Sequence, residues 1–179
     1  MLEYYISANT DFSNRSLRSC LAVQFAEALA TMSTKIDKMT ITKAYEDVRS
    51  DGNETQWGVF IIEGDTIKLS GTGKSFDEFK SSFGDGDRGF GFIRINTGDE
   101  LSKRAKFVLV TWVGPGVSFV KKAKMSVDKT VIKEVILNYS VEILLDNDTD
   151  FTFEYFKTQV DKAGGANYGT GKRTDGTGI

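Results

Sequence analysis

The sequence contains no histidine, one proline and a single cysteine, and these absences exclude several classes of function. Without histidine the chain lacks the commonest general base and the commonest metal ligand, and it cannot form a Ser-His or Cys-His nucleophile pair. Cys20 alone cannot form an internal disulfide or a thiolate metal cluster, which is typical of a reducing compartment such as the cytosol. These absences exclude most hydrolase mechanisms, and we expect no metal or other cofactor.

A large excess of one charge and a long hydrophobic run are also missing. The chain has 23 Lys and Arg residues against 25 Asp and Glu residues, a formal net charge of −2. This balance gives no general attraction to nucleic acids or to anionic membranes. No segment has the roughly 18 consecutive apolar residues of a membrane span, and Gln24 and Glu27 interrupt the one stretch that resembles a signal peptide. We expect no nucleic-acid or membrane partner, so any basic site must be local.

The length of 179 residues favours one folded domain with additional terminal segments. Residues 1–31 do not share the pattern of the rest of the chain and are predicted to be a flexible N-terminal extension. Residues 32–168 are predicted to form the domain. Residues 169–179 are mostly Gly, Thr and charged residues, which cannot bury enough apolar surface to fold, so they are predicted to be a disordered tail.

Apolar residues recur with helical spacing in four places and form strand-like runs in five. The predicted helices occupy 41–48, 76–83, 117–137 and about 150–164, and the predicted strands occupy 57–62, 66–69, 90–95, 107–113 and 141–145. Asp37 or Thr40 is expected to cap the first helix, and the last is expected to bury Phe153, Phe156 and Val160. A long helix between the last two strands makes that pair parallel, whereas the short earlier turns make antiparallel hairpins. The pattern predicts an α/β (α+β) fold in which helices cover both faces of a mixed sheet.

One segment resembles an RNA-binding motif. The run from Arg88 to Ile95 nearly matches the octamer in which strand aromatics stack on bases, here Phe90 and Phe92. That fold requires a helix of about three turns and a further strand between its two motifs, and residues 66–87 hold a hairpin return and a short helix instead. We keep a single-stranded RNA-binding module as the alternative function, although Phe90 and Phe92 fit a hydrophobic core better.

A local excess of positive charge is the strongest functional signal. Residues 102–133 contain one acid, Asp128, and eight basic residues: Lys103, Arg104, Lys106, Lys121, Lys122, Lys124, Lys129 and Lys133. On a continuous helix Lys122, Lys129 and Lys133 fall within about 40° of one another, opposite a side expected to be buried, formed by Val127, Val131 and Val135. Such a surface either keeps the helix soluble or docks an acidic protein partner, and the shortage of acids favours docking. We expect the basic side chains of the loop before strand 107–113 and of the long helix to converge into one exposed surface.

Three segments in order resemble the coactosin branch of the actin-depolymerising-factor homology (ADF-H) family, the family of cofilin. They are Lys103–Trp112, Lys129–Val135 and Lys162–Tyr168, and the likeness extends over residues 32–168. The resemblance implies a mixed five- to six-stranded sheet sandwiched between helices. It also implies a monomeric, non-enzymatic protein of the cytoplasm and cytoskeleton that binds the side of filamentous actin, prefers filaments to actin monomers, and opposes the capping of filament ends.

The resemblance also assigns candidate contact residues. In the family, actin is contacted by the basic turn before the central strand, the long helix and the last helix. Carried over by position and combined with the basic patch, the candidate actin-binding residues are Lys103, Arg104, Lys106, Lys122, Lys124, Met125, Lys129, Lys133 and Lys162. Two features depart from the family pattern: Asp161 occupies a position where relatives often have a second basic residue, and residues 1–31 have no counterpart.

Overall fold

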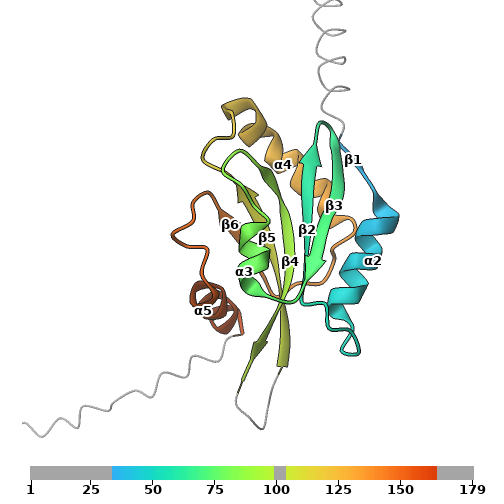
Figure 1. Ribbon diagram of the computed structural model, residues 1–179, viewed down its shortest axis with the longest axis vertical. Coiled ribbons are helices and arrows are strands. Elements are labelled where there is room, and N and C mark those ends of the chain that lie inside the picture. The colour runs from blue at the N-terminus through green and yellow to red at the C-terminus, as the bar shows by residue number, and fades with distance from the viewer. Residues whose placement is uncertain (1–33, 99–103, 165–179) are drawn as a thin grey trace, which may run out of the picture. The chain divides into compact units, whose positions relative to one another are not determined.

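Six strands form one mixed sheet in the order β1-β3-β2-β4-β5-β6, in a computed structural model that describes residues 34–98 and 104–164 (Figure 1). The strands are β1 (Lys35–Ile36), β2 (Trp57–Glu63), β3 (Thr66–Gly73), β4 (Arg88–Thr97), β5 (Arg104–Val113) and β6 (Val141–Leu145). The helices are α2 (Lys38–Arg49), α3 (Phe76–Ser81), α4 (Phe119–Lys133) and α5 (Phe153–Ala163). All nine predicted helices and strands are present in this part of the chain, and the short strand β1 was not predicted.

The strand directions follow from the lengths of the connections. Strands β3, β2, β4 and β5 pair in antiparallel fashion, whereas β6 pairs with β5 in parallel, with Val108 opposite Val141. The parallel pair was predicted, because a chain that crosses over through α4 must return to the same end of the sheet before it re-enters. The mixed sheet predicted from the sequence is therefore confirmed.

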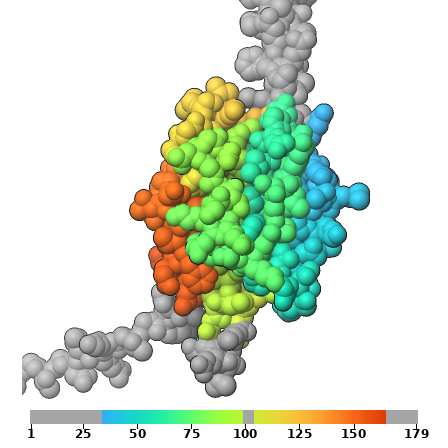
Figure 2. All heavy atoms as spheres, in the orientation of Figure 1, coloured from blue at the N-terminus to red at the C-terminus, as the bar shows by residue number. Residues whose placement is uncertain are grey.

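Helices cover both faces of the sheet, and the alternation of side chains along β4 separates the two cores. Phe90 and Phe92 are fully buried on the face covered by α2 and α4. Ile93 and Ile95 are buried on the face covered by α3 and α5, where the atoms of these two helices close over the sheet (Figure 2). Since each fully buried side chain of this size contributes about 1.5–3 kcal/mol, the two cores stabilise the fold without a disulfide.

The first helix of the sheet domain forms as its sequence predicts. Asp37 caps α2, accepting a hydrogen bond from the backbone N–H of Thr40 at 3.3 Å. The four buried residues of the helix lie at the predicted i, i+3, i+4, i+7 positions: Ile41, Ala44, Tyr45 and Val48. The prediction of this helix, including one of its two candidate caps, is confirmed.

The long helix differs from the prediction in length and in its buried side. It ends at Lys133, so it has 15 residues, and Ile136 is buried in the turn after it. Its buried residues are Met125, Asp128 and Ile132, whereas Val127 is 44% exposed. The expectation that Val127 lies on the buried side is wrong because a charged residue, Asp128, is fully buried.

Asp128 is buried because Arg88 of β4 meets it. The Arg88 guanidinium donates to the Asp128 carboxylate, and both side chains are at least nine-tenths buried. Arg88 also donates to the backbone carbonyl of Lys121 at 3.4 Å. A buried ion pair between two distant elements leaves no periodic signal in the sequence, which is why the helix rotation was misjudged.

The last helix also buries a different residue from the one expected. Phe156 and Val160 are buried as predicted, but Phe153 is 43% exposed. Phe151, which precedes the Thr152 cap, is 1% exposed instead and stacks on Phe156 with ring centroids 5.6 Å apart. The aromatic at i−5 from Phe156 reaches the core because the chain is still extended there.

No helix in the part of the chain that the structure describes is long and apolar enough to cross a membrane.

Candidate functional site

The basic turn before β5 is carried by a hairpin that extends past its neighbouring strand. β6 begins to pair with β5 at Val108, so Arg104 and Lys106 lie beyond the end of β6. The register of β4 with β5 is regular, and Val108, Val110 and Trp112 point into the core beneath α3 and α5. Side chains alternate along a strand, so Arg104 and Lys106 lie on that same face.

A third basic residue belongs to this face of the molecule. Lys162 is exposed in the last turn of α5, the helix that packs Val160 into the core containing Val108 and Ile95. Arg104, Lys106 and Lys162 have no ion pair with any described residue, and we name these three the hairpin cluster. Lys103, the remaining basic residue of the predicted turn, lies outside the described residues.

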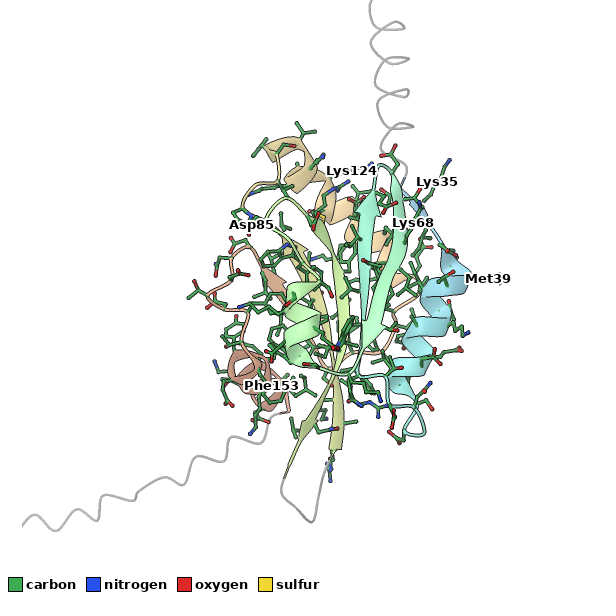
Figure 3. All side chains as sticks on the ribbon, viewed as in Figure 1. Lys35, Met39, Lys68, Asp85, Lys124 and Phe153 are labelled. Atoms are coloured by element: carbon green, nitrogen blue, oxygen red, sulfur yellow. The ribbon has the colours of Figure 1, made fainter. Side chains whose placement is uncertain are left out.

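The lysines of α4 are arranged differently, since most of them are held by acids of the same chain. The Lys124 ammonium lies 2.6 Å from Asp65, in the turn between β2 and β3, and its side chain is only 12% exposed. Figure 3 shows Lys124 beside that turn. Lys129 and Lys133 both contact Glu142 of β6, at 2.8 and 2.6 Å. The predicted site residues Lys124, Lys129 and Lys133 thus fasten α4 to the sheet.

The protonation of these acids reflects their partners. The hydrogen bond from Lys124 holds the pKa of the Asp65 carboxyl below its ordinary value of 3.8. Partial burial would raise the pKa of Glu142, but the hydrogen bonds from Lys129 and Lys133 outweigh it, so that pKa is lower than the ordinary 4.5. The hydrogen bond to Glu142 raises the pKa of Lys133 above 10.5. Both acids are therefore ionised near neutral pH and neutralise part of the charge of α4.

Met125 was predicted to contact the partner, but its side chain is 5% exposed and packs in the core beneath α2 and α4. Its sulfur lies 3.8 Å from the Arg88 guanidinium. Met125 therefore packs α4 onto the sheet and is too buried to contact a protein partner directly.

The expectation that loop and helix lysines converge into one surface is wrong. α4 lies on the opposite face of the sheet from the hairpin cluster, and it begins after the far end of β5 (Figure 1). Between Lys106 and Val113 the strand alone advances roughly 23 Å. The basic residues form two separate sites, at the two ends of β5.

Sequence reasoning missed the most exposed apolar residues at the start of α4. Phe119 and Val120 are 84% and 73% exposed, and they are followed by exposed Lys121 and Lys122, neither of which has an ion pair with a described residue. We name these four residues the α4-start cluster. The signal was available in Ser118, which occupies the N-cap position and so places Phe119 and Val120 in the exposed first turn of the helix.

The aromatic residues of the alternative RNA-binding function are inaccessible. Phe90 and Phe92 are both 0% exposed. The glycines next to them allow close packing: a Cβ at Gly91 would lie 2.5 Å from the Phe79 ring, and one at Gly89 would lie 2.5 Å from the carbonyl oxygen of Phe60. The resemblance to the RNA-binding octamer therefore reflects the close approach of α3 and β2 to β4, and nothing supports RNA binding.

Comparison with known proteins agrees with this architecture. The family described as cofilin/tropomyosin-type actin-binding protein matches residues 33–161. A human coactosin-like protein is 41% identical over 137 residues, covering 76% of this chain and 96% of the relative. Coactosin of Dictyostelium discoideum is 36% identical over 143 residues, covering 78% and 98%.

Solved structures give the same result. A crystal structure of human coactosin-like protein superposes with a TM-score of 0.69 at 38% identity, covering 72% of this chain and 98% of that one. The solution structure of mouse coactosin, described as an actin filament binding protein, gives a TM-score of 0.64 at 40% identity, covering 76% and 96%. The chain belongs to the cofilin/tropomyosin-type actin-binding protein family, and it has the ADF-H fold with coactosins among its relatives.

Proposed function

We propose that this protein binds the side of actin filaments through the hairpin cluster, as a monomer and without catalysis. The observation that carries the proposal is that Arg104, Lys106 and Lys162 share one face of the sheet and have no acidic partner among the described residues. Unpaired cations can meet an acidic protein surface without first breaking internal ion pairs, so they add both attraction and specificity. In family members, actin presents such an acidic surface.

The α4-start cluster is the second proposed contact. Exposed Phe119 and Val120 supply apolar area, and Lys121 and Lys122 supply charge beside it. Such a mixture of apolar anchors with a charged rim is typical of protein interfaces. A filament-bound protein of this kind is expected in the cytoplasm on the cytoskeleton, where it opposes capping.

Co-sedimentation with actin filaments tests the proposal. We expect the full chain to pellet with filaments, and we expect Lys106→Ala and Lys162→Ala each to weaken pelleting. Binding should also weaken as salt rises, because the screening length falls from about 10 Å at 0.1 M to about 3 Å at 1 M. The melting temperature should change little, since exposed charges contribute about 0–1 kcal/mol to folding.

Lys43→Ala is the matched control. Lys43 is an exposed lysine of α2 that has no ion pair with a described residue, on the opposite face of the sheet from the hairpin cluster. It should leave pelleting unchanged. Equal losses for Lys43→Ala and Lys106→Ala would show that binding depends on net charge alone and would refute the assigned site.

A further inference from the structure

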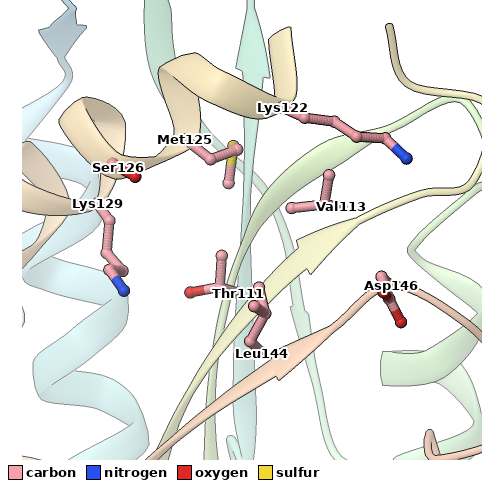
Figure 4. A pocket seen from close by; sticks show the side chains of 8 residues that line it. All are labelled: Thr111, Val113, Lys122, Met125, Ser126, Lys129, Leu144 and Asp146. Atoms are coloured by element: carbon pink, nitrogen blue, oxygen red, sulfur yellow. The ribbon is translucent and has the colours of Figure 1, made fainter. Parts of the chain in front are cut away.

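A pocket lies between α4 and the carboxyl ends of β5 and β6. Of the residues that line it, only Lys122 belongs to the proposed filament contacts. The volume of the pocket is about 280 Å³, close to the lower end of the size range of small-molecule sites, which is about 300 Å³. Eight residues line it (Figure 4): Thr111, Val113, Lys122, Met125, Ser126, Lys129, Leu144 and Asp146. They come from three elements and the loop after β6, so the fold itself shapes the pocket.

Thr111 gives this pocket an unusual polar group. The residue is 2% exposed, on the central strand β5, and its hydroxyl has no hydrogen-bond partner among the described residues. Buried hydroxyls are nearly always bonded, because an unsatisfied one loses its water without compensation. Leu144 pairs with Thr111 in the sheet register and is 68% exposed, so its side chain is free to turn aside. The Thr111 hydroxyl, at the base of the pocket, can therefore still form a hydrogen bond with a ligand.

Positive charge lies at the same end of the pocket. Figure 4 shows the Lys129 ammonium and the Thr111 hydroxyl turned toward one another. Lys129 contacts Glu142 at 2.8 Å, but Glu142 is shared with Lys133 at 2.6 Å, so two ammonium groups surround one carboxylate. The group of three keeps a net positive charge, which suits a second anion next to Lys129 and within reach of Thr111.

Besides Ser126 next to Lys129, the remainder of the pocket is apolar except at its far end. Val113, Met125 and Leu144 supply hydrocarbon surface between the two ends. Asp146 lies at the end away from Lys129, and Lys122 lies at that same end (Figure 4), so a positive and a negative side chain offset one another there. One cationic end, an apolar middle and a far end without net charge together suit a ligand with a single negatively charged group and an apolar chain.

We propose that this pocket binds a small monocarboxylate with a short apolar chain. The carboxylate takes a charge-assisted hydrogen bond from Lys129 and a second hydrogen bond from the Thr111 hydroxyl, and the chain lies on Val113, Met125 and Leu144. Apolar cavities of about 150 Å³ hold benzene, so the pocket has room for a chain of roughly eight carbons. The proposal does not depend on filament binding, because it is tested without actin.

Octanoate is the probe. Adding it to the isotopically labelled full-length chain should shift the amide resonances of Thr111, Ser126 and Leu144 in a saturable manner. 1-Octanol, which has the same chain without a charge, should bind at least tenfold more weakly. Equal binding of octanol would show that the carboxylate is not recognised and would refute the proposed site.

Two lysine variants separate ligand binding from structural effects. Lys129→Met and Lys133→Met each remove one partner of Glu142, but only Lys129 lines the pocket. We expect Lys129→Met to weaken octanoate binding about tenfold or more, as the loss of a charged hydrogen bond does, and Lys133→Met to weaken it by less than threefold. Equal losses would refute the contact with Lys129.

Thr111→Val keeps the shape of the side chain and removes the hydroxyl. Without ligand this variant should be at least as stable to heat as the wild type, because the hydroxyl has no partner among the described residues. Its affinity for octanoate should nevertheless fall severalfold. A variant that binds octanoate as well as the wild type, or a wild type with no saturable shift near the pocket, would overturn the proposal.

Discussion

At the scale of single residues, the contact between Arg88 and Asp128 is the most sensitive point of the fold. Both side chains are at least nine-tenths buried, and they join β4 to α4. Asp128→Asn would leave the Arg88 charge uncompensated, and removing one partner of a buried pair costs about 3–5 kcal/mol. We expect the free energy of unfolding to fall by about that amount, measured by urea denaturation at neutral pH.

The exposed pair of Lys38 and Glu134 provides the control for this substitution. Both side chains are more than half exposed at an N–O distance of 3.2 Å, and such pairs contribute about 0–1 kcal/mol. Glu134→Gln should therefore have little effect. If the paired replacement of Arg88 by Met and Asp128 by Leu restores most of the lost stability, the cost lies in the unpaired charge; if it remains as unstable as Asp128→Asn, this explanation fails.

At the scale of secondary structure elements, the sequence predicted the helices and strands well but oriented α4 poorly. The buried faces of α2 and most of the sheet follow from apolar spacing alone, and Ile41, Ala44 and Val48 are examples. The orientation of α4 depends on Arg88, a residue 40 positions away in the chain. Periodicity reports which residues are apolar and carries no information on such a distant partner. Val131 and Val135 pack against the core as predicted, but Val127 was placed on the buried side and the burial of Asp128 was missed.

The attachment of α4 to β6 should depend on pH. Glu142 has a folded-state pKa below the ordinary 4.5, so its ion pairs with Lys129 and Lys133 stabilise the fold above that value and are lost as pH falls through the folded-state pKa. We expect Glu142→Gln to lower the free energy of unfolding by about 1 kcal/mol at pH 7, a modest value because the pair is partly exposed.

Comparing unfolding at about pH 7 and about pH 3 checks this dependence. The difference between wild type and Glu142→Gln should shrink at the acidic value, because the carboxyl of the unfolded chain is protonated there and the stabilisation by the ion pairs is progressively lost. Glu63→Gln, which removes an exposed pair with Lys68, is the control and should give a small difference at both values. A difference for Glu142→Gln that is as large at the acidic pH would show that the carboxylate charge is not what holds the helix.

At the scale of the whole molecule, the candidate site could be predicted only in part. The excess of basic residues in 102–133 pointed to two regions of the surface whose cations have no ion pair with a described residue, near Lys106 and near Lys122. The sequence could not distinguish those from Lys124, Lys129 and Lys133, because their acids, Asp65 and Glu142, come from other elements. Charge counts along a chain do not show which charges cancel in space.

The separation of the two regions leads to a prediction about filament binding. Lys106 and Lys122 lie at the two ends of β5, well beyond the 7–10 Å within which substitutions commonly interact. If both contact the filament at once, each alanine substitution should cost about 1 kcal/mol, roughly a fivefold loss of affinity. The double variant should then lose roughly 25-fold in co-sedimentation, the product of the two. Full affinity in Lys122→Ala, or a double variant no weaker than Lys106→Ala, would confine binding to the hairpin cluster.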